Sequence, residues 1–162
     1  MSRDVLIQPL DARIFAPFGD VIESAGDPDK IINQGLCGRF HDRAKLEFSD
    51  GRAGLSLFNA KPRTLPLNLD MMERHPDGSQ AFIPMSADPF LVIVAADENG
   101  APGHPQAFET ASGQAINFHR GTWHGVLTPL HARGLFAVVD RLGSGANLQQ
   151  LWFETPYTVR RS

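Results

Sequence analysis

The hydrophobic positions of this chain fall in short runs that have the period of β-strands. Residues 90–96 form a continuous apolar run with a β-branched centre, which is typical of a buried strand, and residues 135–140 form a second such run that ends in Asp140. Residues 53–60 alternate instead, which places Leu55 and Leu57 on one face of a third strand. Turn signals rich in Gly, Asp and Asn separate these runs, at residues 76–78, 97–100, 112–113 and 143–145.

Helical pattern is scarce. The sequence predicts one short helix over residues 11–18, with Asp11 as its N-cap and Gly19 as its stop signal. Many short strands separated by turns predict an all-β fold, a sandwich or a small barrel, with few short helices.

Length and composition narrow the class of protein. The 162 residues amount to about one domain, so residues 1–162 are predicted to form a single domain. A net charge of -3 without a basic stripe argues against a nucleic-acid partner, and the apolar run at 90–96 is too short to span a bilayer. The single cysteine, Cys37, allows no internal disulfide, and the N-terminal segment does not have the pattern of a signal peptide. We therefore expect a soluble cytoplasmic protein.

The first segment with candidate chemistry is residues 67–75. On a strand, its alternate positions share a face that reads Leu, Leu, Met, Glu, His, so Glu73 and His75 follow three apolar residues. The Pro-Asp-Gly turn at 76–78 then reverses the chain, and Gln80 begins the return run. A hairpin of this kind would place Gln80 beside Glu73 and His75.

The second segment is residues 113–124, in which a strand leads through His119 into a turn at Arg120-Gly121. His124 then opens the next strand, with Val126 and Thr128 on the same face. A single histidine on a half-apolar strand is more often structural than functional, so it is the combination that points to chemistry. We expect five side chains to converge on the interior of the β framework, with His75 and His124 within about 10 Å, the reach of one small substrate. They are Glu73, His75, Gln80, His119 and His124.

The spacing of these residues resembles the two motifs of the cupin superfamily. Gly113-x5-His119-x-Gly121-x2-His124 is similar to the second motif, with His119 where a Pro usually stands. Glu73-x-His75-x4-Gln80 is similar to the first, in which a His-x-His pair is followed by Glu. The neutral Gln80 is a poor ligand beside a carboxylate, so we expect any metal to be weakly held.

At finer grain, the chain resembles the ureidoglycolate lyase family. The similar blocks are residues 18–23, 32–36, 39–42, 73–76, 80–85, 117–120, 123–124 and 140–141. The resemblance implies a cupin-like β-barrel (double-stranded β-helix or jelly roll) and a homodimer. It implies cleavage of (S)-ureidoglycolate to glyoxylate and urea in allantoin (purine) catabolism. It also implies stimulation by a divalent metal, nickel in particular.

This reaction assigns roles to the candidate residues. Ureidoglycolate carries a carboxylate, a hydroxyl and a urea nitrogen on one carbon, so its elimination needs a base, an acid and a carboxylate clamp. The predicted catalytic residues are Glu73, His75, His119 and His124. The predicted substrate-binding residues are Asn33, Arg39, His41, Gln80 and Arg120, and the predicted weak metal ligands are His75, Gln80 and His124.

Three points stay open in the sequence. Arg39, Arg63, Arg120 and Arg141 are the candidate carboxylate clamps, whereas Arg74 would point away from the face that carries Glu73. The assignment of base and acid is undecided. Asn33, Arg39 and His41 form a polar cluster in a Gly-containing segment that could close over the barrel mouth.

Two rival functions remain. A non-enzymatic cupin that binds a small molecule would not need acid–base groups, so the Glu and His set counts against it. A metal-dependent cupin dioxygenase or isomerase would require a full set of strong ligands, and Glu73 and Gln80 stand where His and Glu are expected.

Overall fold

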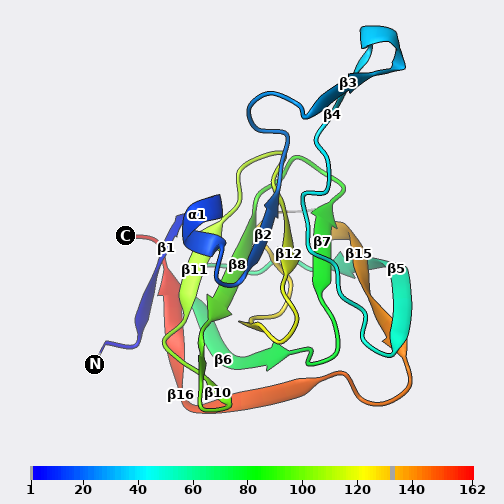
Figure 1. The fold of residues 1–162 in the computed structure, drawn as a ribbon. Coiled ribbons are helices and arrows are strands. Elements are labelled where there is room, and N and C mark those ends of the chain that lie inside the picture. The colour runs from blue at the N-terminus through cyan, green and yellow to red at the C-terminus, as the bar shows by residue number, and fades with distance from the viewer. Residues whose placement is uncertain (1, 132–133) are drawn as a thin grey trace.

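A computed structural model describes residues 2–131 and 134–162, and the regular structure of this part of the chain is almost all β (Figure 1). Its helical elements are α1 (Ala12–Phe15) and the 3-10 turn η1 (Asn33–Gly35). Its strands are β1 (Asp4–Pro9), β2 (Gly19–Ile22), β3 (Lys30–Ile32), β4 (Cys37–Arg39), β5 (Gly51–Ala60), β6 (Leu67–Arg74), β7 (Gln80–Pro84), β8 (Phe90–Ala95), β9 (Asp97–Glu98), β10 (Ala101–Pro102), β11 (Gln106–Glu109), β12 (Ala115–Phe118), β13 (Trp123–His124), β14 (Thr128–Pro129), β15 (Gly134–Gly143) and β16 (Gln149–Arg160).

Two sheets of the described chain face each other and form a barrel, which confirms the predicted cupin-like all-β fold (Figure 1). The larger sheet has the order β11-β1-β16-β6-β13-β8-β14, and β11 also pairs with β8. The smaller sheet has the order β2-β12-β7-β15-β5. No helix in the described residues is both long and apolar enough to cross a membrane.

Strand β8 shows why one run of the sequence is continuously apolar. Val92 and Val94 belong to one hydrophobic cluster, together with Phe82 of the smaller sheet, whereas Leu91 and Ile93 belong to a second cluster. Both faces of β8 are therefore covered, and the strand has no solvent face that would favour polar residues.

The predicted helix is present but shorter than expected. Asp11 is its N-cap, and its Oδ1 accepts hydrogen bonds from the N–H groups of Arg13 and Ile14 at 2.9 and 3.1 Å. The helix ends at Phe15 rather than near residue 18, because Pro17 has no N–H with which to continue the hydrogen bonding.

Two strand predictions are wrong. The predicted hairpin of residues 67–84 does not form, because β6 pairs with β13 and β16 while β7 pairs with β12 and β15. The turn at 76–78 instead carries the chain from one sheet to the other. The predicted strand from His124 to Thr128 is broken after His124, where Gly125 N–H donates to the carbonyl of Ile93 and β14 starts afresh at Thr128.

Candidate active site

Three of the predicted residues meet where the larger sheet ends. Glu73 is near the end of β6, His75 follows that strand, and His124 on β13 lies directly opposite Glu73 across the ladder. One potential ligand atom from each of the three lies within 4.8 Å of the others. The ring centroids of His75 and His124 are 5.2 Å apart, which confirms the predicted proximity of the two histidines.

A cavity of about 420 Å³ opens at this cluster, between the two sheets. Its lining residues are Phe58, Asn59, Ala60, Arg63, Glu73, Gln80, Phe82, His124, Val126 and Leu127. Gln80 reaches it from the first position of β7, so it lies near Glu73 by closure of the barrel and not by a hairpin.

Backbone carbonyls fix the tautomer of both histidines. Nδ1 of His75 is 2.8 Å from the carbonyl oxygen of Asn147, and Nδ1 of His124 is 2.8 Å from that of Gly125. A carbonyl only accepts, so each Nδ1 carries a hydrogen and each neutral ring has its lone pair on Nε2. Within the described residues, neither buried Nε2 has a hydrogen-bond partner.

His124 is held as a neutral imidazole. Its burial, and secondarily the neighbouring His75, lower its pKa to about 3, against a smaller opposing effect of the Gly125 carbonyl. Its ring also stacks on Phe118, with centroids 4.2 Å apart and planes only 4° from parallel. His124 is therefore a rigid acceptor at the base of the site.

Gln80 presents an acceptor as well. Its Nε2 donates to Oδ2 of Asp140 at 3.1 Å, which leaves its buried Oε1 without a hydrogen-bond partner among the described residues. Glu73, His75, Gln80 and His124 therefore form a set of acceptors. Such a set can bind the N–H and O–H groups of a small polar ligand, and its imidazole nitrogens and carboxylate also fit a divalent cation.

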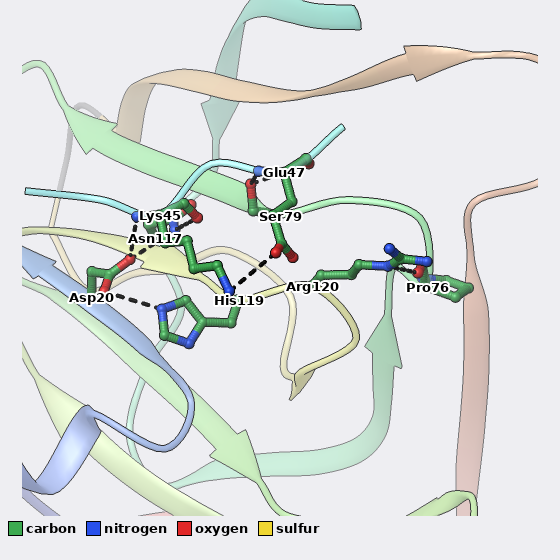
Figure 2. Close-up of polar contacts among 8 residues, drawn as sticks. All are labelled: Asp20, Lys45, Glu47, Pro76, Ser79, Asn117, His119 and Arg120. Atoms are coloured by element: carbon green, nitrogen blue, oxygen red, sulfur yellow. Dashed lines mark hydrogen bonds and ion pairs between the residues drawn. The ribbon is translucent and has the colours of Figure 1, made fainter. Parts of the chain in front are cut away.

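The structure does not bring His119 to this set. Position 119 follows the inward-facing Phe118, and its Nε2 lies 3.0 Å from Oδ1 of Asp20, where Asn117 and Lys45 also converge (Figure 2). Burial tends to raise the pKa of Asp20, but hydrogen bonds from Asn117, Lys45 N–H and His119 outweigh it and hold the pKa below its ordinary value.

Arg120 also lies outside the cavity lining. Its Nε donates to the carbonyl of Pro76 at 2.6 Å, and the N–H of Gly121 donates to the carbonyl of His75 at 3.0 Å (Figure 2). The 120–121 turn thus supports the segment that carries His75.

Asn33 and Arg39 lie on the β3–β4 hairpin, which projects from the barrel (Figure 1). His41 follows this hairpin, and its backbone N–H donates to Asp29. These three residues are not among those that line the cavity of the same chain.

Arg141 and Arg74 do not line the cavity and have other hydrogen-bond partners. Arg141 donates to the backbone carbonyls of Ser49, Asp50 and Ser144, and Arg74 donates to Asp97 and Gln149. Of the candidate clamps, Arg63 is the one that borders the cavity.

Sequence reasoning missed the residues that hold the site residues in place. Asn147 accepts from His75, Asp140 accepts from Gln80, and Gln150 donates to Glu73 at 3.4 Å. These residues belong to β15, β16 and the link between them. No local pattern in the sequence indicates that these segments contact β6 and β7.

Comparison with known proteins agrees with this geometry. The sequence model of the family described as Ureidoglycolate lyase matches residues 2–160. A ureidoglycolate lyase of Rhodobacter capsulatus is 56% identical over 96% of this chain and 97% of its own length. Ureidoglycolate lyase 2 of Rhizobium meliloti is 52% identical over 94% and 95%, and a ureidoglycolate lyase of Chelativorans is 49% identical over 97% and 96%. The chain therefore belongs to the ureidoglycolate lyase family of enzymes.

Proposed function

We propose that this protein cleaves (S)-ureidoglycolate to glyoxylate and urea, in allantoin catabolism, by an elimination that proton transfer assists. The names of its relatives support the substrate. The observation that carries the proposal is that Glu73, His75 and His124 bring acceptor atoms together at a cavity that Arg63 borders.

The elimination needs one group that takes a proton from the substrate hydroxyl and later donates it to the urea nitrogen. The base removes the proton of the substrate hydroxyl, the oxygen electrons form the aldehyde C=O, and the C–N bond breaks towards the urea nitrogen. Glu73 and His75 are half-buried beside the cavity, so one of them serves as this base. The proton that the base collects is then delivered to the urea nitrogen, so no second proton donor is required.

Other residues bind and orient the substrate. Arg63 has a planar guanidinium that can hold the substrate carboxylate through two hydrogen bonds, which Lys cannot do. The buried acceptors of Gln80 and His124 suit the N–H groups of the ureido end.

A divalent metal, nickel by family resemblance, belongs to the proposal as a stimulatory ion rather than a tightly bound one. His75, Gln80 and His124 would hold it, with Glu73 beside them. When bound, it would act as a Lewis acid that polarises the substrate hydroxyl or carboxylate. The same resemblance leads us to propose a homodimer that works in the cytoplasm.

Product analysis tests the reaction. On a preparation free of urease, glyoxylate and urea should form in equal amounts, with no ammonia, and the His75→Ala variant serves as the blank. Ammonia released in step with glyoxylate would contradict the lyase assignment, because it would indicate attack of water on the ureido carbonyl.

A further inference from the structure

Gln80 and Asp140 lie directly opposite each other on the inner face of the smaller sheet. Gln80 begins β7, and Asp140 is its partner across the ladder with β15. Two residues further along β7, Phe82 lies opposite Val138, and both belong to a hydrophobic cluster to which the two sheets contribute. Because alternate residues of a strand share a face, the side chains of Gln80 and Asp140 also point inwards.

The Asp140 carboxylate determines which end of the Gln80 amide faces it. A primary amide has an oxygen that accepts and a nitrogen that donates, and a half-turn of the group exchanges the two. An ionised carboxylate only accepts, so it binds the nitrogen, and Gln80 Nε2 donates to Asp140 Oδ2 at 3.1 Å. The reversed amide would bring two acceptor oxygens together, which is repulsive.

The oxygen end of the amide is therefore held away from Asp140. On its other side Gln80 pairs with Phe118 of β12, whose ring stacks on His124. Gln80 is only 6% exposed and lines the cavity, while its Oε1 has no hydrogen-bond partner among the described residues. A buried acceptor without a partner is unfavourable, so this oxygen favours a ligand that brings a donor to it.

We propose that Asp140 is a positioning residue that makes the site specific for ligands with N–H groups at this end. Asp140 is not among the residues that line the cavity, so it acts through the orientation of Gln80 and not by touching the ligand. The ureido group of the proposed substrate carries such N–H groups, so the inference rests on the proposed function for the identity of the substrate. A ligand with only acceptors at this end would meet an oxygen that Asp140 prevents from turning away.

The same pair explains why an amide and not a carboxylate stands at position 80. A glutamate there would place a second carboxylate against Asp140, and two like charges at hydrogen-bond distance do not both stay ionised. Exchange of the two groups should preserve the arrangement. In the double variant Gln80→Glu/Asp140→Asn, the amide at position 140 donates to the carboxylate at position 80, whose second oxygen still faces the cavity.

Two unreactive ligands of equal charge and similar shape test the inference without turnover. N-carbamoylglycine keeps the carboxylate and the ureido group of ureidoglycolate but has no hydroxyl from which elimination can start. Levulinate has the same chain length, charge and carbonyl, with CH2 and CH3 in place of NH and NH2. Calorimetric titration of the wild type in EDTA should give a Kd for N-carbamoylglycine about 10- to 100-fold below that for levulinate.

Substitution of Asp140 should weaken this preference. Asp140→Asn should lower the ratio of the two Kd values by about tenfold, because the Gln80 amide is then free to turn its NH2 towards the levulinate carbonyl. Gln80→Glu/Asp140→Asn should restore the wild-type ratio, since it fixes an acceptor again. Asp88→Asn is the matched control, because it removes the same charge from an exposed side chain outside the cavity, and it should leave the ratio unchanged. Both ligands are monoanions, so a general effect of the lost charge cancels in the ratio.

NMR of the wild type tests the orientation of the amide without a substitution. One Nε2 proton of Gln80 should resonate downfield because of its hydrogen bond to Asp140, and it should stay there when N-carbamoylglycine binds. An unchanged ratio in Asp140→Asn, or a Gln80 signal that N-carbamoylglycine moves to the position of a free amide, would overturn the inference. A protein that distinguishes the two ligands as expected but forms no glyoxylate from ureidoglycolate would contradict the proposed function alone.

Discussion

At the scale of single residues, the chemistry of the site depends on which ring nitrogen of His75 and of His124 carries a hydrogen. Because backbone carbonyls bind Nδ1–H of both histidines, their Nε2 atoms are the acceptors available for substrate. His75→Ala removes one of the two candidate bases, and we expect turnover to fall by about 10²- to 10⁴-fold. The turnover of His124→Ala should fall by a factor in the same range, because this substitution removes a buried hydrogen-bond acceptor. Steady-state kinetics measure both, and His104→Ala, which changes an exposed histidine, should keep wild-type activity.

Arg63 is expected to act mainly on substrate binding. A charged hydrogen bond contributes about 1.5–3 kcal/mol, so Arg63→Ala should lower kcat/KM by about 10- to 100-fold, chiefly through KM. Arg63→Lys should recover only part of this loss, because it keeps the charge without the two-pronged geometry. Arg52→Ala removes an exposed arginine of β5 and should leave KM unchanged. Equal kinetics for the two Arg63 variants and the wild type would exclude Arg63 as the clamp.

At the scale of elements, local pattern predicted strands but not their neighbours. The run at 90–96, the N-cap at Asp11 and the shared face of Glu73 and His75 depend on residues close in sequence, and each prediction is confirmed. The predicted hairpin is wrong because closure of the barrel, rather than the turn at 76–78, determines which strands pair with β6 and β7. β16 escaped prediction because its register shifts between Trp152 and Tyr157, around Pro156, which interrupts the alternation. The sequence therefore did not predict that Gln150, at the start of β16, contacts Glu73. It also did not predict that Asn147, in the link between β15 and β16, contacts His75.

The link between β15 and β16 positions the segment after β6. The carbonyl of Asn147 accepts from His75, and its side-chain Oδ1 accepts from Asp77 N–H at 2.7 Å. Asn147→Ala leaves that N–H without its partner and frees the link to move. We expect about a tenfold loss in kcat/KM, the effect of about 1.4 kcal/mol. Asn147→Asp keeps an acceptor oxygen and should retain more activity.

A positioning role for Asn147 has a second readout. In the wild type, the ¹⁵N chemical shifts of His75 should report a hydrogen on Nδ1, whereas Asn147→Ala should give a mixture of tautomers. A loss of activity with the His75 tautomer unchanged would assign Asn147 a role in stability alone.

At the scale of the whole molecule, the acceptor set exists only in the folded barrel. Glu73, His75 and His124 come from the larger sheet or its end, while Gln80 comes from the smaller sheet. A cation that binds this set should therefore stabilise the folded state over the unfolded chain, by about 1.4 kcal/mol for each tenfold rise in concentration above its Kd.

Thermal unfolding in the presence of nickel tests that coupling without an activity assay. The Tm of the wild type should rise with nickel concentration, and His124→Ala should abolish the rise because it removes a buried nitrogen donor. His104→Ala should keep it, which controls for binding to exposed histidines. Since Gln80 supplies a neutral oxygen where a carboxylate would bind more strongly, EDTA should return the Tm to its metal-free value and lower turnover only in part. Complete loss of turnover with EDTA, restored by one specific ion, would show instead that the ion is required for catalysis.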